Sequence, residues 1–109
     1  VKDNFTIMKE EPFGPLVPLL TFKDFDEVIE RANNNDLGLC GYIYTNNLER
    51  ANRASELMET GCVAVNTAAV AVAEAPFGGI KQTGYGREGG SMAIKDYLNI
   101  KYTHFGISY

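Results

Sequence analysis

Two short motifs in this chain carry residue types that could build a small-molecule site. The first is the bend Glu-Glu-Pro-Phe-Gly-Pro at residues 10–15, and the second is Pro-Phe-Gly-Gly at residues 76–79. A carboxylate accepts hydrogen bonds, and an aromatic ring offers a flat apolar surface to a ligand. Proline and glycine restrict or permit the backbone turns on both sides of these groups. Rigid turns that present a carboxylate and two rings exceed what a hydrophobic core requires, so both motifs indicate a binding site.

The sequence between these motifs alternates short apolar runs with amphipathic stretches, which is the pattern of α/β proteins. Residues 16–22 read as a strand or an extended segment. Asp24 provides a helix N-cap, with Glu27 three positions later. The apolar face that follows at helical spacing consists of Phe25, Val28, Ile29 and Ala32. We therefore expect a one-sided helix that ends at the asparagine run 33–35.

A second unit of the same kind follows along the chain. Residues 41–45 predict a strand, and Asn46 with Glu49 repeats the capping spacing. The helix face expected after this cap consists of Leu48, Ala51, Ala54 and Met58. Gly61 is expected at the C′ position of that helix, and the unbroken apolar run 62–65 predicts a strand covered on both faces. This order of elements favours a parallel or mixed sheet with crossover helices.

The carboxyl-terminal part has a different texture. Residues 67–75 are small and almost wholly apolar, and a glycine-rich loop and a short helix at about 91–97 follow. Residues 99–107 read as a final strand with apolar and aromatic residues on both faces. Such a strand needs a partner, from this chain or from another.

Composition limits the classes of protein to which the chain can belong. At 109 residues it is one domain at most, and its net charge of −4 is spread along the sequence. This argues against nucleic acid or an anionic membrane as partner, because both favour clustered Lys and Arg. No apolar run reaches the roughly 18 residues of a membrane-spanning helix. The amino terminus does not resemble a secretion signal, so we expect a cytoplasmic protein.

Cysteine usage predicts no metal site. Cys40 and Cys62 lie in apolar surroundings, which predicts two buried reduced thiols, with a disulfide as the alternative. The single histidine, His104, is far along the chain from both thiols, so zinc is not expected.

Residues 84–89, Gly-Tyr-Gly-Arg-Glu-Gly, match the pattern of a dinucleotide-binding turn. That turn requires a buried strand directly before its first glycine and an acidic residue about 20 positions beyond it. Residues 80–83 are not such a strand, and the sequence has almost ended where the acid belongs. A solvated glycine loop is the better local interpretation, and a stand-alone nucleotide-binding domain is the weakest alternative.

The order of motifs along the whole chain resembles the aldehyde dehydrogenase superfamily. The resemblance rests on residues 10–15, on Val-Asn at 65–66, on Pro-Phe-Gly-Gly-x-Lys-x-x-Gly-x-Gly-Arg-Glu at 76–88 and on Tyr-Leu-x-x-Lys at 97–101. It implies an α/β fold with a partial three-layer sheet and crossover helices. By this resemblance residues 1–97 are the carboxyl-terminal part of the catalytic domain, and residues 98–109 are an oligomerisation strand. Within this superfamily the sequence most resembles the succinate-semialdehyde dehydrogenase branch.

The resemblance also implies roles for single residues. Glu11 is expected to accept hydrogen bonds from the hydroxyls of the nicotinamide ribose, and Phe13 to pack beside the nicotinamide. Phe77 is expected to line the aldehyde tunnel, and Ala71 and Val72 fall where the family varies its substrate pocket. Ala71 stands where the succinate-semialdehyde branch has a serine for the substrate carboxylate. A semialdehyde and a less polar aldehyde are therefore equal alternatives for the substrate.

Four other residues of the shared motifs are expected to have structural roles. Asn66 should tie loop to strand. The residues that should brace the glycine loop by ion pairs and backbone hydrogen bonds are Lys81, Arg87 and Glu88.

The chemistry of this family needs groups that the sequence does not contain. A cysteine thiolate attacks the aldehyde, hydride passes to NAD or NADP, and water hydrolyses the thioester. Neither Cys40 nor Cys62 lies in the glutamine-containing motif of that nucleophile, and the segment with the base glutamate is absent. We assign no catalytic residue and no metal. We predict a fragment that is inactive and binds no cofactor alone, whereas the complete enzyme would bind NAD or NADP and an aldehyde.

The same resemblance predicts a homo-oligomer assembled through residues 98–109. Separation from the rest of an enzyme should also leave apolar faces of the sheet uncovered, and self-association would cover them. A non-catalytic module that binds a partner by strand addition is the main alternative function.

Overall fold

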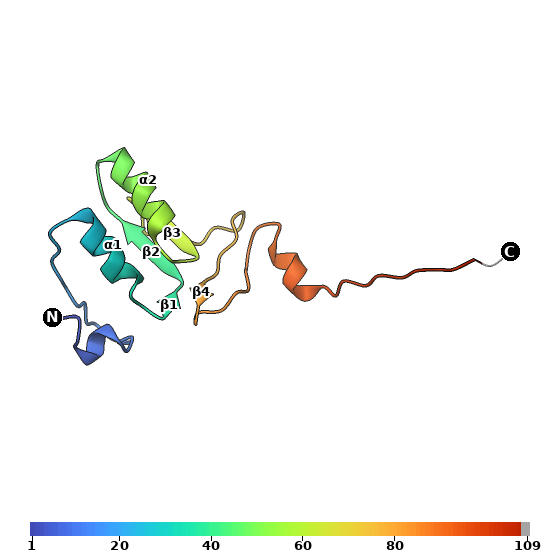
Figure 1. The fold of residues 1–109 in the computed structure, drawn as a ribbon, viewed down its shortest axis with the longest axis horizontal. Coiled ribbons are helices and arrows are strands. Elements are labelled where there is room, and N and C mark those ends of the chain that lie inside the picture. The colour runs from blue at the N-terminus through green and yellow to red at the C-terminus, as the bar shows by residue number, and fades with distance from the viewer. Residues whose placement is uncertain (108–109) are drawn as a thin grey trace.

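A computed structural model describes residues 1–107 of the chain (Figure 1). The two α-helices are α1 (Phe25–Asn33) and α2 (Leu48–Leu57), and short 3-10 helices lie at Thr6–Met8 and Ala93–Tyr97. The strands are β1 (Leu37–Gly38), β2 (Cys40–Ile43), β3 (Cys62–Val65) and β4 (Ile80–Lys81). The molecule extends 75 Å along its longest axis because the residues after the second 3-10 helix run away from the rest as an extended chain.

The centre of the fold is a β2-α2-β3 unit. The two strands are parallel, with Cys40 opposite Cys62 and Ile43 opposite Val65, and α2 connects them and packs on both. The α/β class and the crossover helix are thus confirmed. The N-cap of α2 is Asn47, whose side chain accepts from the backbone N–H of Arg50 at 2.9 Å. The prediction of Asn46 as the cap was wrong by one residue.

Helix α1 forms as its spacing predicts. The Oδ1 of Asp24 accepts from the backbone N–H of Glu27 at 2.9 Å, and the helix ends within the asparagine run. Asn33 then joins the ends of both helices. Its amide group donates to the carbonyl of Leu57 at 2.8 Å and accepts from the N–H of Glu59 at 2.8 Å.

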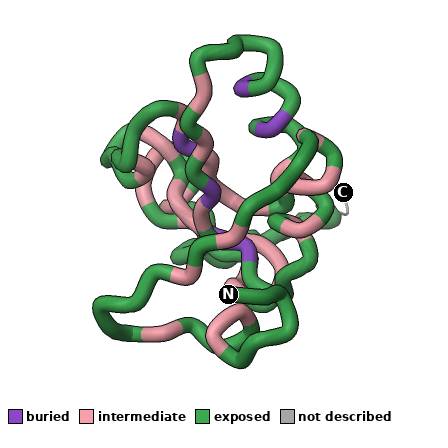
Figure 2. The backbone as a smooth tube through the Cα atoms, turned by 90° about the vertical axis from the view of Figure 1, so that its left-hand side faces the viewer, coloured by how far each residue is buried: buried purple, intermediate pink, exposed green. Residues whose placement is uncertain are grey.

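The buried core of the described residues is small. The buried apolar residues are Ala51, Ala54 and Ala64. Short buried stretches of the backbone lie among half-buried and exposed ones (Figure 2). Of β3 only Ala64 is buried, so the prediction of a strand covered on both faces was wrong for this chain. The apolar run 62–65 still lacks a cover over part of its surface within residues 1–107. Of the strand residues, Leu37 and Tyr42 are 45% and 50% exposed.

Gly61 has a different role from the one predicted. Helix α2 ends at Leu57 with Met58 as its C-cap, so Gly61 lies beyond the C′ position. A Cβ atom added to Gly61 would lie 1.8 Å from the carbonyl oxygen of Gly78. Glycine is required here because two backbone segments touch, and this contact sets the position of the loop that carries Phe77.

Residues 1–22, which we call the amino-terminal arm, contain one short 3-10 helix and no strand. The alternative of a strand at 16–22 was therefore wrong, and the segment has no strand partner within the described residues. Most of its side chains are exposed, including Val17 at 80%. Its position relative to α1 therefore depends on a few specific contacts.

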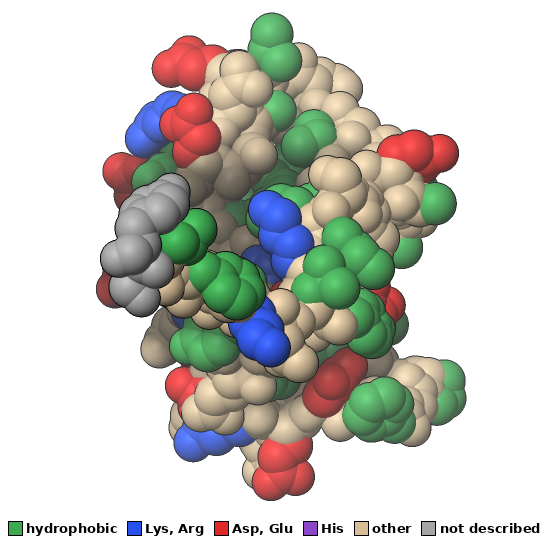
Figure 3. Space-filling model, turned by 90° about the vertical axis from the view of Figure 1, so that its right-hand side faces the viewer, with side chains coloured by type: hydrophobic (Ala, Val, Ile, Leu, Met, Phe, Trp, Pro, Cys, Tyr) green, Lys and Arg blue, Asp and Glu red, His purple; other side chains and the backbone are tan. Residues whose placement is uncertain are grey.

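Residues 98–107, which we call the carboxyl-terminal tail, form no paired strand within the described part of the chain. The large apolar side chains of the tail are exposed, namely Leu98, Ile100, Tyr102, Phe105 and Ile107. Viewed from the tail end, apolar side chains are scattered over this face of the molecule with Lys and Arg among them (Figure 3). The predicted oligomerisation strand 98–109 ends at residues 108 and 109, which lie outside the described residues. None of the helices among residues 1–107 is long and apolar enough to cross a membrane.

Candidate functional site

Phe77 is held at the base of the glycine-rich loop by a pair of backbone hydrogen bonds. Its N–H donates to the carbonyl of Glu88 at 2.7 Å, and the N–H of Glu88 donates back to the carbonyl of Phe77 at 2.7 Å. The half-buried ring of Phe77 lines a hollow of about 370 Å³ with Leu39, Thr83, Arg87 and Tyr97. A flat apolar wall beside a hollow is the role predicted for Phe77, but the family-based assignment itself stays a prediction.

Arg87 and Lys81 brace this loop as predicted. One Nη1 atom of Arg87 donates to the carbonyls of Gly79, Tyr85 and Gly86 at 2.7, 3.0 and 3.0 Å. The Nζ of Lys81 donates to the carbonyls of Asn33 and Asn35 at 2.8 and 3.0 Å and pairs with the Glu59 carboxylate at 2.6 Å. Both cations therefore satisfy backbone carbonyls, through Nη1 of Arg87 and through Nζ of Lys81.

Asn66 has the structural role expected of it. Its side-chain oxygen accepts from the N–H of Thr45, and its amide donates to the carbonyl of Thr45, both at 2.9 Å. Its backbone lies in the left-handed region with φ of 55°, which asparagine tolerates better than most residues. The pair of bonds ties the end of β3 to the end of β2, directly before the segment with Ala71 and Val72.

The glycine loop 84–89 is not a dinucleotide turn. The strand before it, β4, has two residues, and the element after it is the 3-10 helix at Ala93–Tyr97. Gly89 has φ of 67°, and a Cβ added there would lie 2.7 Å from the carbonyl of Ala75. The loop therefore lies against the turn at residues 72–76 and supports it. The match of residues 84–89 to a nucleotide-binding pattern gave no indication of this role.

Val72 begins that turn, Ala71 directly precedes it, and both residues are exposed. The carbonyl of Val72 accepts from the N–H of Ala75 at 3.3 Å, and the carbonyl of Ala73 accepts from the N–H of Gly90 at 2.9 Å. Neither Ala71 nor Val72 lines the hollow beside Phe77. The structure thus links these substrate-pocket candidates to Phe77 through the backbone and does not bring their side chains into one cavity.

Glu11 and Phe13 lie on the amino-terminal arm, apart from that hollow. Two tight turns shape the bend, because the N–H of Gly14 donates to the carbonyl of Pro12 at 2.9 Å and that of Leu16 to the carbonyl of Gly14 at 2.8 Å. Glu11 is exposed, and Phe13 is 95% exposed. The ribose and nicotinamide roles expected of Glu11 and Phe13 stay predictions.

A larger hollow of about 540 Å³ lies next to the asparagine run, between residues 33–36 and Tyr85. Lys81 lines this hollow and carries a positive charge, but the amine of Lys81 is already bound to two carbonyls and a carboxylate. We therefore do not include this hollow in the site. Among residues 1–107 no cluster of three or more metal-ligating side chains occurs.

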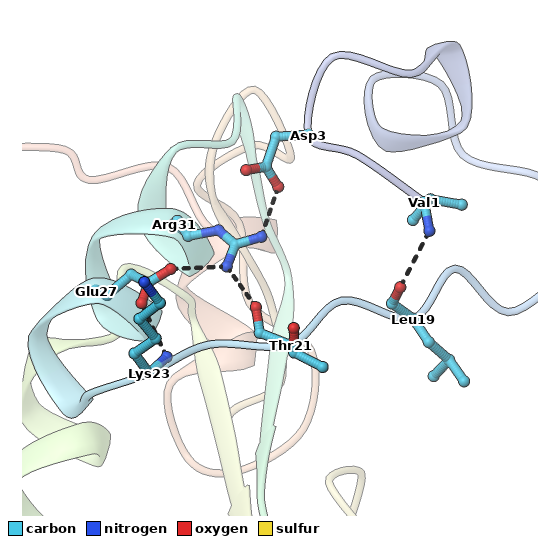
Figure 4. A network of polar contacts seen from close by, with 7 residues as sticks. All are labelled: Val1, Asp3, Leu19, Thr21, Lys23, Glu27 and Arg31. Carbon is cyan, nitrogen blue, oxygen red and sulfur yellow. Dashed lines mark hydrogen bonds and ion pairs between the residues drawn. The ribbon is translucent and has the colours of Figure 1, made fainter.

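Arg31 links the amino-terminal arm to α1, and sequence reasoning missed it (Figure 4). Its Nη2 donates to Oδ1 of Asp3 at 2.9 Å, and its Nη1 donates to the carbonyl of Thr21 at 2.9 Å and to Oε1 of Glu27 at 3.2 Å. The hydrogen bond to Asp3 raises the pKa of Arg31 above its usual value, against the opposing effect of partial burial. The spacing of Glu27 and Arg31 signals a helical ion pair, but no sequence pattern indicates Asp3 or Thr21 as partners.

The two cysteines are free and lie side by side as register partners of β2 and β3. Both are half-buried, so the predicted full burial of these thiols was wrong. Burial raises the pKa of the Cys40 thiol, and the neighbouring Cys62 adds to the effect. A nucleophilic cysteine needs a lowered pKa. The raised pKa disfavours the thiolate form of Cys40, and no catalytic role is assigned to this residue.

Comparison with known proteins places these features in a context. The model of the Aldehyde dehydrogenase family matches residues 1–103. A 3-sulfolactaldehyde dehydrogenase of Pseudomonas putida is 52% identical over 106 residues, which are 97% of this chain and 22% of that protein. The succinate-semialdehyde dehydrogenase [NADP(+)] GabD of Escherichia coli K12 is 48% identical over 107 residues, which are 98% of this chain and 22% of GabD.

The three-dimensional match agrees with the sequence match. The crystal structure of a succinate-semialdehyde dehydrogenase from Burkholderia pseudomallei superposes with a TM-score of 0.90 at 44% identity, over 94% of this chain and 21% of that chain. The chain thus spans about a fifth of the length of the relatives that it matches.

Proposed function

Because the chain belongs to the aldehyde dehydrogenase family, we propose that it forms part of an enzyme that oxidises an aldehyde to a carboxylic acid with NAD or NADP. The observation that carries this proposal is the match of family, sequence and fold over nearly the whole chain. The chain supplies binding and positioning groups, and the nucleophilic cysteine and the base belong to sequence that it does not contain.

In this proposal the bend at residues 10–15 binds the cofactor side of the site. The exposed carboxylate of Glu11 accepts hydrogen bonds from the ribose hydroxyls, and the exposed ring of Phe13 limits the position of the nicotinamide. The cofactor, when bound, accepts the hydride removed from the substrate. Phe77 forms one wall of the path for the aldehyde, and Ala71 and Val72, which do not line the hollow beside Phe77, contribute to another part of the substrate pocket.

The substrate class is a short aldehyde, and semialdehydes are the first candidates. Two relatives are named for 3-sulfolactaldehyde and succinate semialdehyde, which both carry an anionic group. Ala71 offers no hydroxyl to such a group, and a missing hydrogen bond to an anion costs about 1.5–3 kcal/mol if nothing replaces it. A less polar aldehyde is therefore the competing candidate, and a substrate panel separates the two.

The decisive experiment uses a complete enzyme. The 107-residue region of GabD that this chain matches is replaced by the corresponding residues of this chain, and we call the product the grafted enzyme. We expect it to reduce NADP with succinate semialdehyde or with a neutral aldehyde of similar length. Residues 1–109 alone should show no activity. A folded grafted enzyme that oxidises neither class of aldehyde, or an active isolated chain, would contradict the proposal.

The roles of single residues are tested in the same enzyme with adjacent controls. Glu11→Gln should raise the KM for the cofactor about tenfold, because a charged acceptor becomes neutral. Glu10→Gln is the matched control and should leave that KM unchanged. Phe77→Ala should instead raise the KM for the aldehyde. Equal effects of Glu10→Gln and Glu11→Gln would overturn the role given to Glu11.

Assembly into a homo-oligomer through the tail belongs to the same proposal. The support is the row of exposed apolar side chains along residues 98–107, which a neighbouring sheet could cover. The same row favours strand addition to a partner as the second candidate function. Deleting residues 98–109 from the grafted enzyme should reduce the number of subunits in the assembly, as measured by sedimentation. An unchanged number of subunits would count against assembly through the tail and against strand addition. A cytoplasmic location also remains a proposal, for which two free thiols are the support.

A further inference from the structure

We propose that Arg31 is a positioning residue for the cofactor side of the site, because its guanidinium holds both ends of the loop that carries Glu11 and Phe13. This inference rests on the proposed function, in which that loop approaches the nicotinamide cofactor. Asp3 and Thr21 lie on either side of the bend, one before it and one after it. Both contact the same guanidinium at 2.9 Å, so one side chain closes the loop (Figure 4).

Arg31 is itself a fixed anchor. It lies on α1, its side chain is 28% exposed, and Glu27 one turn earlier pairs with it at 3.2 Å. Glu27 is in turn fixed, because its Oε2 accepts from the N–H of Lys23 at 2.9 Å and its own N–H is capped by Asp24. The first turn of α1 therefore orients Glu27, and Glu27 orients the guanidinium.

The arm has few other means of keeping its place. Phe13, Val17 and Leu19 are 95%, 80% and 76% exposed, so they contribute little packing. The second link drawn in Figure 4 joins the amino group of Val1 to the carbonyl of Leu19 at 3.3 Å, and it lies on the surface. Within the described residues the side-chain hydrogen bonds between the arm and α1 are all made by Arg31.

Arginine suits this task because its planar fork presents several donors at fixed angles. Nη2 serves the end of the loop before the bend, and Nη1 serves the end after it. The Nε of Arg31 is buried and has no hydrogen-bond partner among the described residues. A lysine carries its three donors on a single nitrogen and lacks the fixed spacing of the two guanidinium nitrogens that reach Asp3 and Thr21.

The expected consequence is specific to the cofactor. Displacement of a positioning group by about 1 Å can reduce catalysis about a hundredfold. Release of the loop should misplace Glu11 and Phe13, while Phe77 is held by separate backbone contacts. A loss caused by general destabilisation would instead affect cofactor and aldehyde together.

The test compares Arg31→Gln with Arg53→Gln in the grafted enzyme. Arg53 is the matched control because it also contacts α1, through Asp26 at 3.6 Å and the ring of Phe25 at 4.6 Å, but it does not contact the arm. We expect Arg31→Gln to raise the KM for NADP about tenfold, with the KM for the aldehyde changed by less than about twofold. Arg31→Lys should give an intermediate value, and Arg53→Gln should leave both KM values unchanged.

Hydrogen exchange supplies a readout that does not need activity. Arg31→Gln should accelerate exchange across residues 4–20, and Arg53→Gln should not. If the grafted enzyme is inactive, the proposed function fails, but this exchange pattern still decides whether Arg31 holds the arm. If Arg31→Gln does not fold, Asp3→Asn replaces it, because Asp3 is 63% exposed and its removal creates no cavity. Unchanged exchange at residues 4–20, or equal rises in both KM values, would overturn the inference.

Discussion

The two regions that carry the proposed site are held in place by different forces. The loop with Phe77 lies against Gly61 with backbone touching backbone, and a reciprocal pair of 2.7 Å hydrogen bonds closes its base. The amino-terminal arm with Glu11 and Phe13 is exposed and is tied to α1 by the guanidinium of Arg31. One region is fixed by excluded volume, and the other is fixed by charge and hydrogen bonding at its ends.

This difference predicts different responses to change. Steric contact between backbone segments does not depend on salt or pH, but it tolerates no added atom. An exposed ion pair is weakened by salt and by loss of either partner, but the arm that it holds tolerates many substitutions. In the proposed enzyme the aldehyde path would therefore be rigid, and the approach of the cofactor would be adjustable through single polar residues.

The largest expected effect is that of Gly61→Ala in the grafted enzyme. The new methyl group would meet the carbonyl of Gly78 at 1.8 Å, so strand β3 and the loop must separate. We expect the free energy of local opening at the amides of Phe77 and Glu88 to fall by about 3 kcal/mol, as in severe overpacking. Hydrogen exchange measures this fall.

Gly14→Ala is the control in the arm. A Cβ at Gly14 would meet nothing within 4 Å, so exchange in the arm and at Phe77 should stay as in the parent. If both substitutions are equally harmless, the distinction between a packed loop and a tethered arm is wrong.

A smaller effect is expected for Asn66→Ala, which removes the polar link beside the packed region. Two hydrogen bonds to Thr45 are lost, and alanine must adopt a φ of 55°. Together these changes should cost about 1–2 kcal/mol, since Asn66 is exposed. Asn66→Gly removes the same bonds without the backbone strain, so its cost should be lower. Thermal unfolding of both variants in the grafted enzyme measures the difference in stability between them. A greater loss of stability for Asn66→Gly than for Asn66→Ala would contradict this explanation.

The sequence predicted the local structure of the chain better than its long-range contacts. Helix α1 and its cap at Asp24 could be predicted because the signal lies within one turn. The N-cap of α2 was predicted at Asn46 but lies at Asn47, because two adjacent asparagines offer the same chemistry. Gly61 was misassigned because a glycine needed for close approach to Gly78 has the same sequence signature as a helix C′ glycine.

The same limit applies to the candidate site. The bend at 10–15 and the loop at 76–79 could be found from residue types alone. Arg31 could not be connected to Asp3 and Thr21, because those contacts join positions with no common periodicity. The cover expected on both faces of β3 is missing from residues 1–107. An apolar run indicates that a strand is to be buried, but it does not indicate which segment or which chain covers the strand.

The N-caps of α1 and α2 provide the next comparison, because both helices begin with the same kind of side-chain hydrogen bond but only α1 contacts the arm. Asp24→Ala and Asn47→Ala each remove one side-chain acceptor from a helix N-terminus, and each should cost about 1 kcal/mol. Only the first cap lies in the turn that orients Glu27 and, through it, Arg31. Asp24→Ala should therefore also speed exchange at residues 4–20, whereas Asn47→Ala should leave the arm unchanged. Faster exchange in the arm of both variants would show that the arm responds to general loss of stability.

The smallest expected effect is that of salt on the unaltered grafted enzyme. Raising the concentration of NaCl from about 0.1 M to about 1 M shortens the screening length from about 10 Å to about 3 Å. The Asp3–Arg31 pair is partly exposed, so its loss should weaken the arm by less than about 1 kcal/mol. Exchange at residues 4–20 should rise by a few-fold at most, and exchange at Phe77 and Glu88 should not change. In Asp3→Asn the salt response of the arm should shrink, because the screened partner is gone and the neutral bond from Arg31 to the Thr21 carbonyl remains. An arm that responds to salt equally with and without Asp3 would mean that charge does not hold it, and the contrast with the packed loop would then need another cause.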